Sequence, residues 1–162
     1  MEQALERAKN TELLILDVDG VLTDGSLYYG PDGEVIKRFH VHDGAGIKAV
    51  LEAGIKVAVI SSRRTPAVDK RMHELGVSHV LQGVGDKLQA LNELGERLGI
   101  ELNAVACVGD DVSDVPMMRS VGLAVAVADA RQQAKESAHY STAARGGHGA
   151  VREVCDLLLV AR

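Results

Sequence analysis

Aromatic residues are scarce in this chain. Its 162 residues include no Trp, one Phe and three Tyr. Proteins that read nucleic acids commonly stack bases on aromatic rings and attract the phosphate backbone with a basic surface. Because the rings are few and the formal net charge is −5 at pH 7, we expect no nucleic-acid partner. The core must be built from Val, Leu, Ile and Ala.

Cysteines and long apolar runs are also few. The two cysteines, Cys107 and Cys155, lie far apart in the sequence, which argues against a disulfide framework or a zinc ribbon. No apolar run approaches the roughly 18 residues that cross a bilayer. Residues 1–10 are charged and lack the apolar centre of a signal peptide. The expectation is a cytoplasmic protein with no membrane partner.

Apolar runs typical of strands alternate with segments typical of helices along the chain. Strands are expected at about 12–17, 56–60, 77–81, 104–108 and 123–128, and helices at about 2–9, 44–53, 66–75, 86–98, 113–119, 130–137 and 150–160. Such alternation predicts βαβ units with right-handed crossovers. The predicted fold is one α/β domain over residues 1–162, a three-layer α/β/α, Rossmann-like sandwich with a mostly parallel sheet.

Two segments depart from this alternation. Two β-prone runs around Pro31-Asp32-Gly33 predict a β-hairpin insertion over about 23–41, after the first strand. Because an isolated hairpin is marginal in water, we expect it to pack on something, such as another subunit. A Gly-rich stretch before the last amphipathic segment predicts a C-terminal tail and helix over about 143–162.

Acidic, hydroxyl and basic side chains follow several predicted strands. The carboxyl ends of parallel strands meet at one edge of a sheet, where α/β proteins bind their ligands. We therefore expect these side chains to converge, although single acids of this kind are often solvated turn residues. The converging set is Asp17, Asp19, Ser61, Lys87, Asp110, Asp111 and Asp114.

This set suits phosphoryl transfer. Asp17 can attack phosphorus and form an aspartyl phosphate, and Mg²⁺ held by Asp17 and Asp110 would screen the repulsion between the two anions. Lys87 would neutralise further charge and Ser61 would donate to a phosphoryl oxygen. Asp19 can protonate the leaving group and then deprotonate the attacking water.

The motifs Asp17-Val18-Asp19-Gly20, Ser61, Lys87 and Gly109-Asp110-Asp111-Val112-Ser113-Asp114 resemble, in order, the four motifs of the haloacid-dehalogenase superfamily of phosphatases. Together with the hairpin and the late stretch Arg145-Gly146-Gly147-His148-Gly149, the chain resembles the family of 3-deoxy-D-manno-octulosonate 8-phosphate phosphatases. The resemblance implies an enzyme of lipopolysaccharide precursor synthesis and a homotetramer of capless subunits. In such a homotetramer, the hairpin of one subunit and the C-terminal tail of a neighbouring subunit help close the active site. It also implies that Mg²⁺ touches the backbone carbonyl of Asp19.

The family's substrate contacts, to a small phosphorylated sugar acid, map onto residues on both sides of the second strand. They are Asp19, His40, Val41, His42, Asp43, Gly44, Lys48, Arg63, Arg71 and Lys87. Relatives often carry Arg where this chain has His42 and Lys48, and Thr-Gly-Arg where it has Ser61-Ser62-Arg63. The alternatives are a phosphatase of nine-carbon, sialic-acid-type 9-phosphates and a non-catalytic tetrameric scaffold.

Several residues keep two interpretations at this stage. Asp114 could position Lys87 or cap its helix, and Asp111 could be an ordinary acid at a helix N-terminus. Ser61 could cap the following helix. Arg63 could form a surface ion pair. Lys48 and Arg71 are as consistent with a solvated helix face as with substrate contacts, and His42 is as consistent with an ordinary hydrogen-bonded histidine as with a ligand contact.

Overall fold

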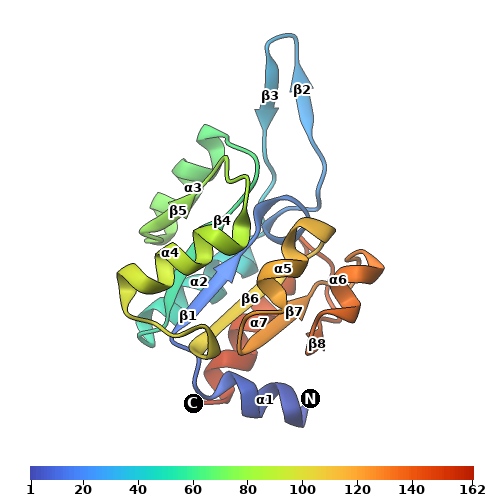
Figure 1. Cartoon of the computed structure of the whole chain (residues 1–162). Coiled ribbons are helices and arrows are strands. Elements are labelled where there is room, and N and C mark those ends of the chain that lie inside the picture. Colours follow the sequence, from blue (N-terminus) through green and yellow to red (C-terminus); the bar gives the residue numbers. More distant parts are fainter.

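A six-stranded parallel sheet forms the centre of the computed structural model, which describes residues 1–162 apart from the side chains of residues 34 and 35. The strand order is β5-β4-β1-β6-β7-β8 (Figure 1). The strands are β1 (Leu13–Leu16), β4 (Lys56–Ile60), β5 (His79–Leu81), β6 (Val105–Gly109), β7 (Leu123–Ala126) and β8 (Tyr140–Ser141).

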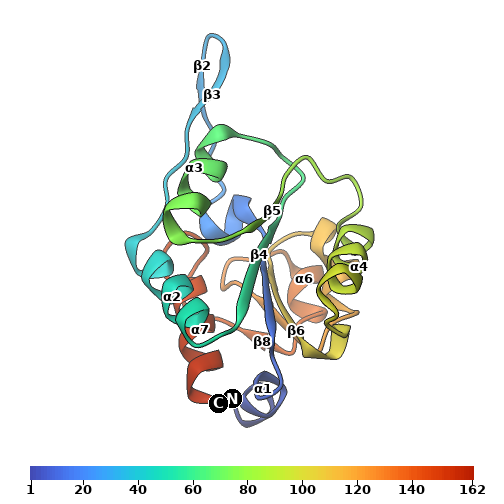
Figure 2. The same cartoon turned by 90° about the vertical axis from the view of Figure 1, so that its left-hand side faces the viewer.

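Helices cover both faces of this sheet. The helices are α1 (Glu2–Ala8), α2 (Val41–Glu52), α3 (Pro66–Leu75), α4 (Lys87–Leu98), α5 (Val115–Met118), α6 (Gln132–Glu136) and α7 (Ala150–Val160). Figure 2 shows α2, α3 and α7 on one face and α4 and α6 on the other. The predicted α/β/α sandwich with a mostly parallel sheet is therefore confirmed. None of the helices that the structure describes has the length and apolar character needed to cross a bilayer.

Strand β1 lies inside the sheet because its sequence buries both faces. Leu13, Leu14, Ile15 and Leu16 are all fully buried, and β1 pairs in parallel with β4 on one side and β6 on the other. A continuous aliphatic run is typical of a strand covered by helices on both faces. The three neighbouring strands thus deliver the residues that follow them to one edge of the sheet.

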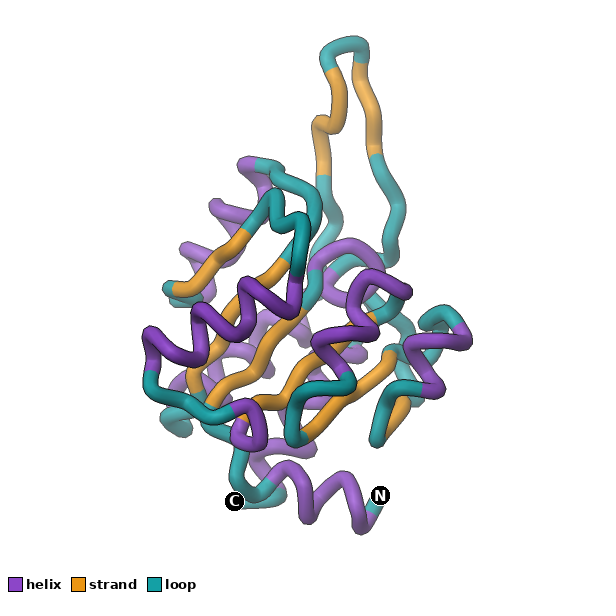
Figure 3. The backbone as a smooth tube through the Cα atoms, viewed as in Figure 1, coloured by secondary structure: helices purple, strands orange, loops and turns teal.

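The hairpin predicted after the first strand is present as β2 (Tyr28–Gly30) and β3 (Gly33–Ile36). It projects from the body of the molecule (Figures 1 and 3). Leu27, Tyr28, Tyr29 and Ile36 are exposed on it. An apolar, solvent-exposed hairpin is marginal by itself, so the expectation that another surface covers it stays a prediction.

Beyond shifts of one or two residues at element ends, the structure differs from the sequence-based expectation in three places. Helix α2 begins at Val41 rather than at residue 44, because the His40 ring nitrogen Nδ1 accepts a hydrogen bond from the backbone N–H of His42 and caps the helix. The helix expected over 113–119 is split into a 3₁₀ turn, Val112–Asp114, and α5. The two-residue strand β8 was not predicted, since so short a segment carries no periodic signal.

The C-terminal helix belongs to the core. Val151, Val154, Cys155 and Leu158 of α7 are fully buried, and α7 packs against α2. Its N-terminus is held by Asp43 of α2, whose carboxylate accepts a hydrogen bond from the backbone N–H of Arg152 at 2.8 Å.

Candidate active site

A small cavity of about 140 Å³ opens at the carboxyl edge of β1, β4 and β6. Seven of the predicted site residues line it, together with two serines that the sequence analysis did not select. The lining residues are Asp17, Asp19, Ser61, Ser62, Arg63, Lys87, Asp110, Asp111 and Ser113. Segments from four separate parts of the chain thus meet at one place.

The loop after β1 is a tight turn that starts at Asp17. The Asp17 carboxylate oxygen Oδ1 accepts a hydrogen bond from the Val18 N–H at 2.7 Å, and the turn is closed by the Thr23 N–H, which donates to the Val18 carbonyl at 3.0 Å. Gly20 has φ +90°, and a Cβ there would lie 2.1 Å from Asp110 Oδ2. Glycine is required at this position because the Asp110 carboxylate packs directly against it.

Lys87 lies between two carboxylates. Its ammonium Nζ is 3.1 Å from Asp17 Oδ1 and 2.6 Å from Asp114 Oδ1. Burial alone would lower the pKa of Lys87, but the negative charges of Asp17 and Asp114 outweigh it and raise that pKa. Lys87 is therefore a fixed cation beside Asp17.

Asp114 holds several groups at once. Its other oxygen, Oδ2, accepts hydrogen bonds from the backbone N–H groups of Asp110 (3.0 Å) and Asp111 (3.1 Å), and the Asp114 side chain is fully buried. Asp114 thus pairs with Lys87 and also completes a capping box with Asp111, so the structure shows a contact for each of the two roles considered from the sequence. Asp111 in turn accepts from the Val112 N–H.

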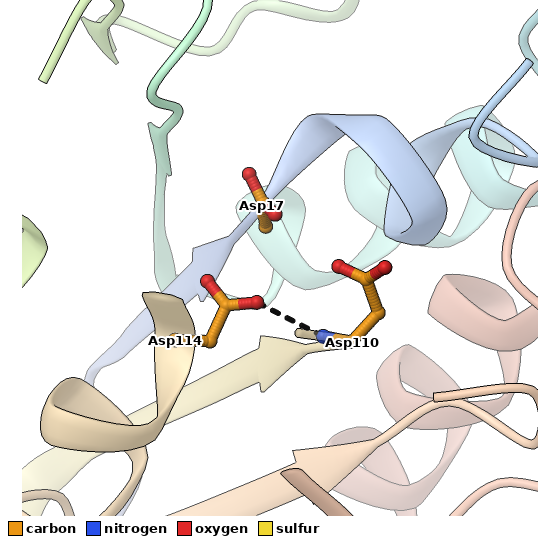
Figure 4. A group of neighbouring side chains, drawn as sticks. All are labelled: Asp17, Asp110 and Asp114. Carbon is orange, nitrogen blue, oxygen red and sulfur yellow. Dashed lines mark hydrogen bonds between the residues drawn. The ribbon is translucent and has the colours of Figure 1, made fainter. Parts of the chain in front are cut away.

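Three carboxylates crowd together at this edge of the sheet. Asp17, Asp110 and Asp114 each offer an oxygen, and these atoms lie within 4.8 Å of one another (Figure 4). Burial and the charge of Asp114 raise the pKa of Asp17 to about 6, although Lys87 opposes the shift. Burial and the charges of Asp17 and Asp114 raise the pKa of Asp110 to about 8.

The donor set fits a hard divalent cation. Asp110 Oδ1 is buried and has no hydrogen-bond partner among the described residues, and an oxygen ligand in that position is what Mg²⁺ prefers. The crowding of Asp17 and Asp110 would be relieved by such an ion. Asp114 is a poor third ligand, because Lys87 and two backbone N–H groups already occupy its oxygens.

Asp19 points into the cavity from the same turn and faces two cations. Lys37 Nζ lies 2.5 Å from Asp19 Oδ1, and Arg63 Nε lies 3.8 Å from Asp19 Oδ2. Arg63 also donates to the hydroxyl of Tyr29 in the hairpin, at 3.2 Å. The sequence did not single out Lys37, because it lies inside the second β-prone run of the predicted hairpin, where no motif marks it.

Ser61 sits at the end of β4, as predicted. It is buried, its N–H donates to the Leu81 carbonyl at 2.9 Å and its carbonyl accepts from the Val84 N–H at 3.0 Å. These backbone bonds fix the residue at the cavity wall.

The other predicted substrate contacts lie on or just before α2, or, for Arg71, on α3, and none of them lines the cavity that the described residues form. They are His40, Val41, His42, Asp43, Gly44, Lys48 and Arg71. Asp43 is buried against α7. Arg71 packs against Gly44 and pairs with Glu74 at 3.5 Å. Their substrate roles stay predictions.

The Gly-rich segment before α7 lies against the first motif of the same chain. The Gly147 N–H donates to the Val21 carbonyl at 3.0 Å. A Cβ on Gly146 would lie 1.7 Å from the Gly20 carbonyl oxygen. The Gly146 N–H is in turn held by Asp129 at 3.0 Å.

Comparison with known proteins identifies the family. The family model of haloacid dehalogenase-like hydrolases matches residues 79–153. The 3-deoxy-D-manno-octulosonate 8-phosphate phosphatase KdsC of Yersinia pestis is 48% identical over 161 residues, which cover 99% of this chain and 86% of that protein. The protein of the same name from Escherichia coli K12 is 51% identical over 158 residues, covering 98% and 84%. This chain belongs to the haloacid dehalogenase-like hydrolases.

Solved structures agree with this assignment. The Yersinia pestis phosphatase superposes with a TM-score of 0.96 over 99% of this chain and 86% of that one, at 48% identity. The Moraxella catarrhalis 3-deoxy-D-manno-octulosonate 8-phosphate phosphatase, solved with a magnesium ion, a phosphate ion and KDO, superposes with a TM-score of 0.97 over 100% and 93%, at 42% identity. The family and fold predictions are therefore confirmed.

Proposed function

We propose that this hydrolase is a Mg²⁺-dependent phosphatase that converts 3-deoxy-D-manno-octulosonate 8-phosphate to the free sugar acid and phosphate. It acts through an aspartyl phosphate, in lipopolysaccharide precursor synthesis. The observation that carries the proposal is the position of Asp17, held beside both Lys87 and Asp110 at the cavity, in a chain about half identical to phosphatases of this name.

Asp17 is the nucleophile. Its carboxylate is fixed at the end of β1 by the Val18 N–H and by Lys87, so it needs little reorganisation before it attacks. The bond from an Asp17 oxygen to phosphorus forms as the bond from phosphorus to the sugar oxygen breaks. Lys87 offsets the charge that gathers on the phosphoryl oxygens.

Asp17, Asp110 and the backbone carbonyl of Asp19 would hold Mg²⁺. When bound, the ion supplies charge neutralisation for the carboxylates and the phosphoryl group. Asp114 acts through other residues: it fixes Lys87 and the backbone of Asp110.

Asp19 is the general acid and base. It lines the cavity two residues after Asp17, in the turn that Asp17 caps, and would reach the leaving-group oxygen while Asp17 reaches phosphorus. It gives a proton to the departing sugar alkoxide. It later takes a proton from the water that attacks phosphorus, as the bond from phosphorus to the Asp17 oxygen breaks and phosphate is released. Ser61 and Arg63 line the same cavity and contribute donors to the substrate.

Self-association as a homotetramer is part of the proposal. The cavity of about 140 Å³ is small beside the roughly 300–1,000 Å³ of typical ligand sites, so one subunit accommodates little more than a phosphoryl group. A neighbour packed on the exposed hairpin would supply further walls, and the residues around the start of α2 would then be substrate contacts. A cytoplasmic location remains a prediction that cell fractionation tests.

Phosphate release tests the proposed function. We expect release from 3-deoxy-D-manno-octulosonate 8-phosphate with Mg²⁺ and none with EDTA, and a lower kcat/KM for nine-carbon 9-phosphates. The Asp17→Asn variant should be inactive, whereas Asp69→Asn, an exposed acid on α3, should match the unmodified protein. A preference for the nine-carbon ester would favour the sialic-acid-type alternative. No turnover of any sugar phosphate would refute the enzyme and favour the scaffold.

A further inference from the structure

We propose that Lys37 is a positioning residue for Asp19, holding that carboxylate in the orientation in which it exchanges protons with the leaving group and water. The inference rests on the proposed function, because it assigns Asp19 the role of acid and base. It adds a residue at the base of the hairpin to the machinery of the site.

The burial of Lys37 is the first observation. Lys37 follows β3 directly, in the arm of the hairpin that returns to the body of the protein. Only 1% of its side chain is exposed, whereas lysines are almost never buried so completely without an anionic partner. The Asp19 carboxylate, 2.5 Å from Nζ, explains why the ammonium lies there.

The second observation is that the Asp19 carboxylate meets cations from two directions. Lys37 approaches Oδ1 and Arg63 approaches Oδ2, but the two contacts differ in quality. The Lys37 contact is short and buried. The Arg63 contact is 3.8 Å long and its side chain is 40% exposed, so solvent weakens it. Lys37 is therefore the stronger of these two restraints.

The turn holds the backbone of Asp19, whereas its carboxylate is positioned by side chains from other segments, Lys37 and Arg63. The residue has extended dihedral angles (φ −74°, ψ 113°) inside a turn, and Gly20 follows with φ +90°. A buried ammonium from a different segment fixes the carboxylate where proton transfer requires it.

Through these contacts the hairpin also influences the position of the Asp19 carboxylate. Tyr29 in β2 accepts a hydrogen bond from Arg63, and Lys37 lies at the end of β3. Both cations that face Asp19 are thus tied to the hairpin. The hairpin would then orient the acid and base as well as offering an apolar surface.

Two variants and one control test the inference with the full-length protein. Lys37→Met keeps the length of the side chain and removes the charge, Lys37→Arg keeps the charge, and Lys70→Met removes an exposed lysine from α3. For each, kcat and KM are measured with the sugar 8-phosphate. The rise in melting temperature with Mg²⁺ and beryllium fluoride, which mimics a phosphoryl group on a carboxylate, reports separately on Asp17.

We expect kcat of Lys37→Met to fall about 10- to 100-fold, part of the roughly 10²- to 10⁴-fold that acid–base catalysis contributes. KM should stay within about twofold, because Lys37 acts through Asp19 rather than on the substrate. The rise in melting temperature with beryllium fluoride should match that of the unmodified protein. Lys37→Arg should recover most of kcat, and Lys70→Met should change nothing.

Several outcomes would overturn the inference. An unchanged kcat for Lys37→Met shows that Asp19 needs no such support. A raised KM with an intact kcat makes Lys37 a substrate contact instead. If Lys37→Met loses both kcat and the rise in melting temperature with beryllium fluoride, the role of Lys37 is structural. The same holds if Lys37→Arg is as slow as Lys37→Met. If the unmodified protein itself releases no phosphate, the proposed function fails first, which is a separate result.

Discussion

Replacing Lys87 by Met should destabilise the metal-free protein strongly at pH 8. The ammonium lies 3.1 Å from Asp17 and 2.6 Å from Asp114, and only 3% of the Lys87 side chain is exposed. Removing one partner of a buried ion pair costs about 3–5 kcal/mol, because the remaining charge is buried without compensation. For a chain of this size each kcal/mol lowers the melting temperature by about 2–4 °C, so we expect a fall of roughly 6–20 °C.

A double-mutant cycle checks whether the cost comes from the pair itself. The four proteins are the unmodified chain, Lys87→Met, Asp114→Asn and the double variant, unfolded with urea in EDTA. Asn at position 114 can still accept from the N–H groups of Asp110 and Asp111. The double variant should therefore lose less free energy of unfolding than the two single variants lose together, and the difference should be about 1–3 kcal/mol. The reasoning would be refuted if the losses in free energy of unfolding of the two single variants simply added up in the double variant. It would also be refuted if the free energy of unfolding of Lys87→Met lay within about 0.5 kcal/mol of that of the unmodified protein.

Three further predictions concern the tail, the carboxylates and the hairpin. Gly146→Ala should lower both the melting temperature and kcat, because its Cβ would collide with the Gly20 carbonyl at 1.7 Å; an unperturbed variant would contradict this packing. The pKa values of Asp17 (about 6) and Asp110 (about 8) lie above their ordinary range. Metal-free stability should therefore fall as pH rises from about 4 to about 8 and level off above that, and the stabilisation by Mg²⁺ should grow over the same range; thermal melts with EDTA or Mg²⁺ measure both, and a metal-free melting temperature that does not change with pH would count against the raised pKa values. Ile36→Ser on the exposed hairpin should weaken self-association in sedimentation experiments, and an unchanged association state would exclude that surface.

The sheet could be predicted because its signals are local. The aliphatic run of β1 and the glycine after α3 (Gly76, φ +80°) mark elements without any knowledge of tertiary contacts. The start of α2 could not be predicted in this way, because it depends on the hydrogen bond that the His40 ring accepts from the backbone N–H of His42. Nor could the broken helix after β6, where Asp114 bonds backward to Asp110 and Asp111 instead of continuing a regular turn.

The acids of the candidate site could be located for a related reason. Parallel strands bring the residues that follow them to one edge, so the positions of Asp17 and Asp110 follow from strand order. This rule does not predict the position of Lys37, because Lys37 does not follow a strand of the parallel sheet. It reaches Asp19 from a hairpin that lies outside the sheet, and nothing in its own sequence neighbourhood reveals that its side chain turns inward.

The loop that carries Asp17 and Asp19 is fixed from two sides by contacts that depend on glycine. On one side the Asp110 carboxylate packs against Gly20, and on the other Gly146 packs against the carbonyl of the same residue. Gly20 therefore lies between the fourth motif, which contains Asp110, and the segment that leads into the last helix. Since α7 is buried in the core, the position of the loop that carries Asp17 and Asp19 depends on the chain having folded as far as its final helix. Substitutions in the segment around Gly146 should therefore lower kcat by displacing the loop that carries Asp17 and Asp19.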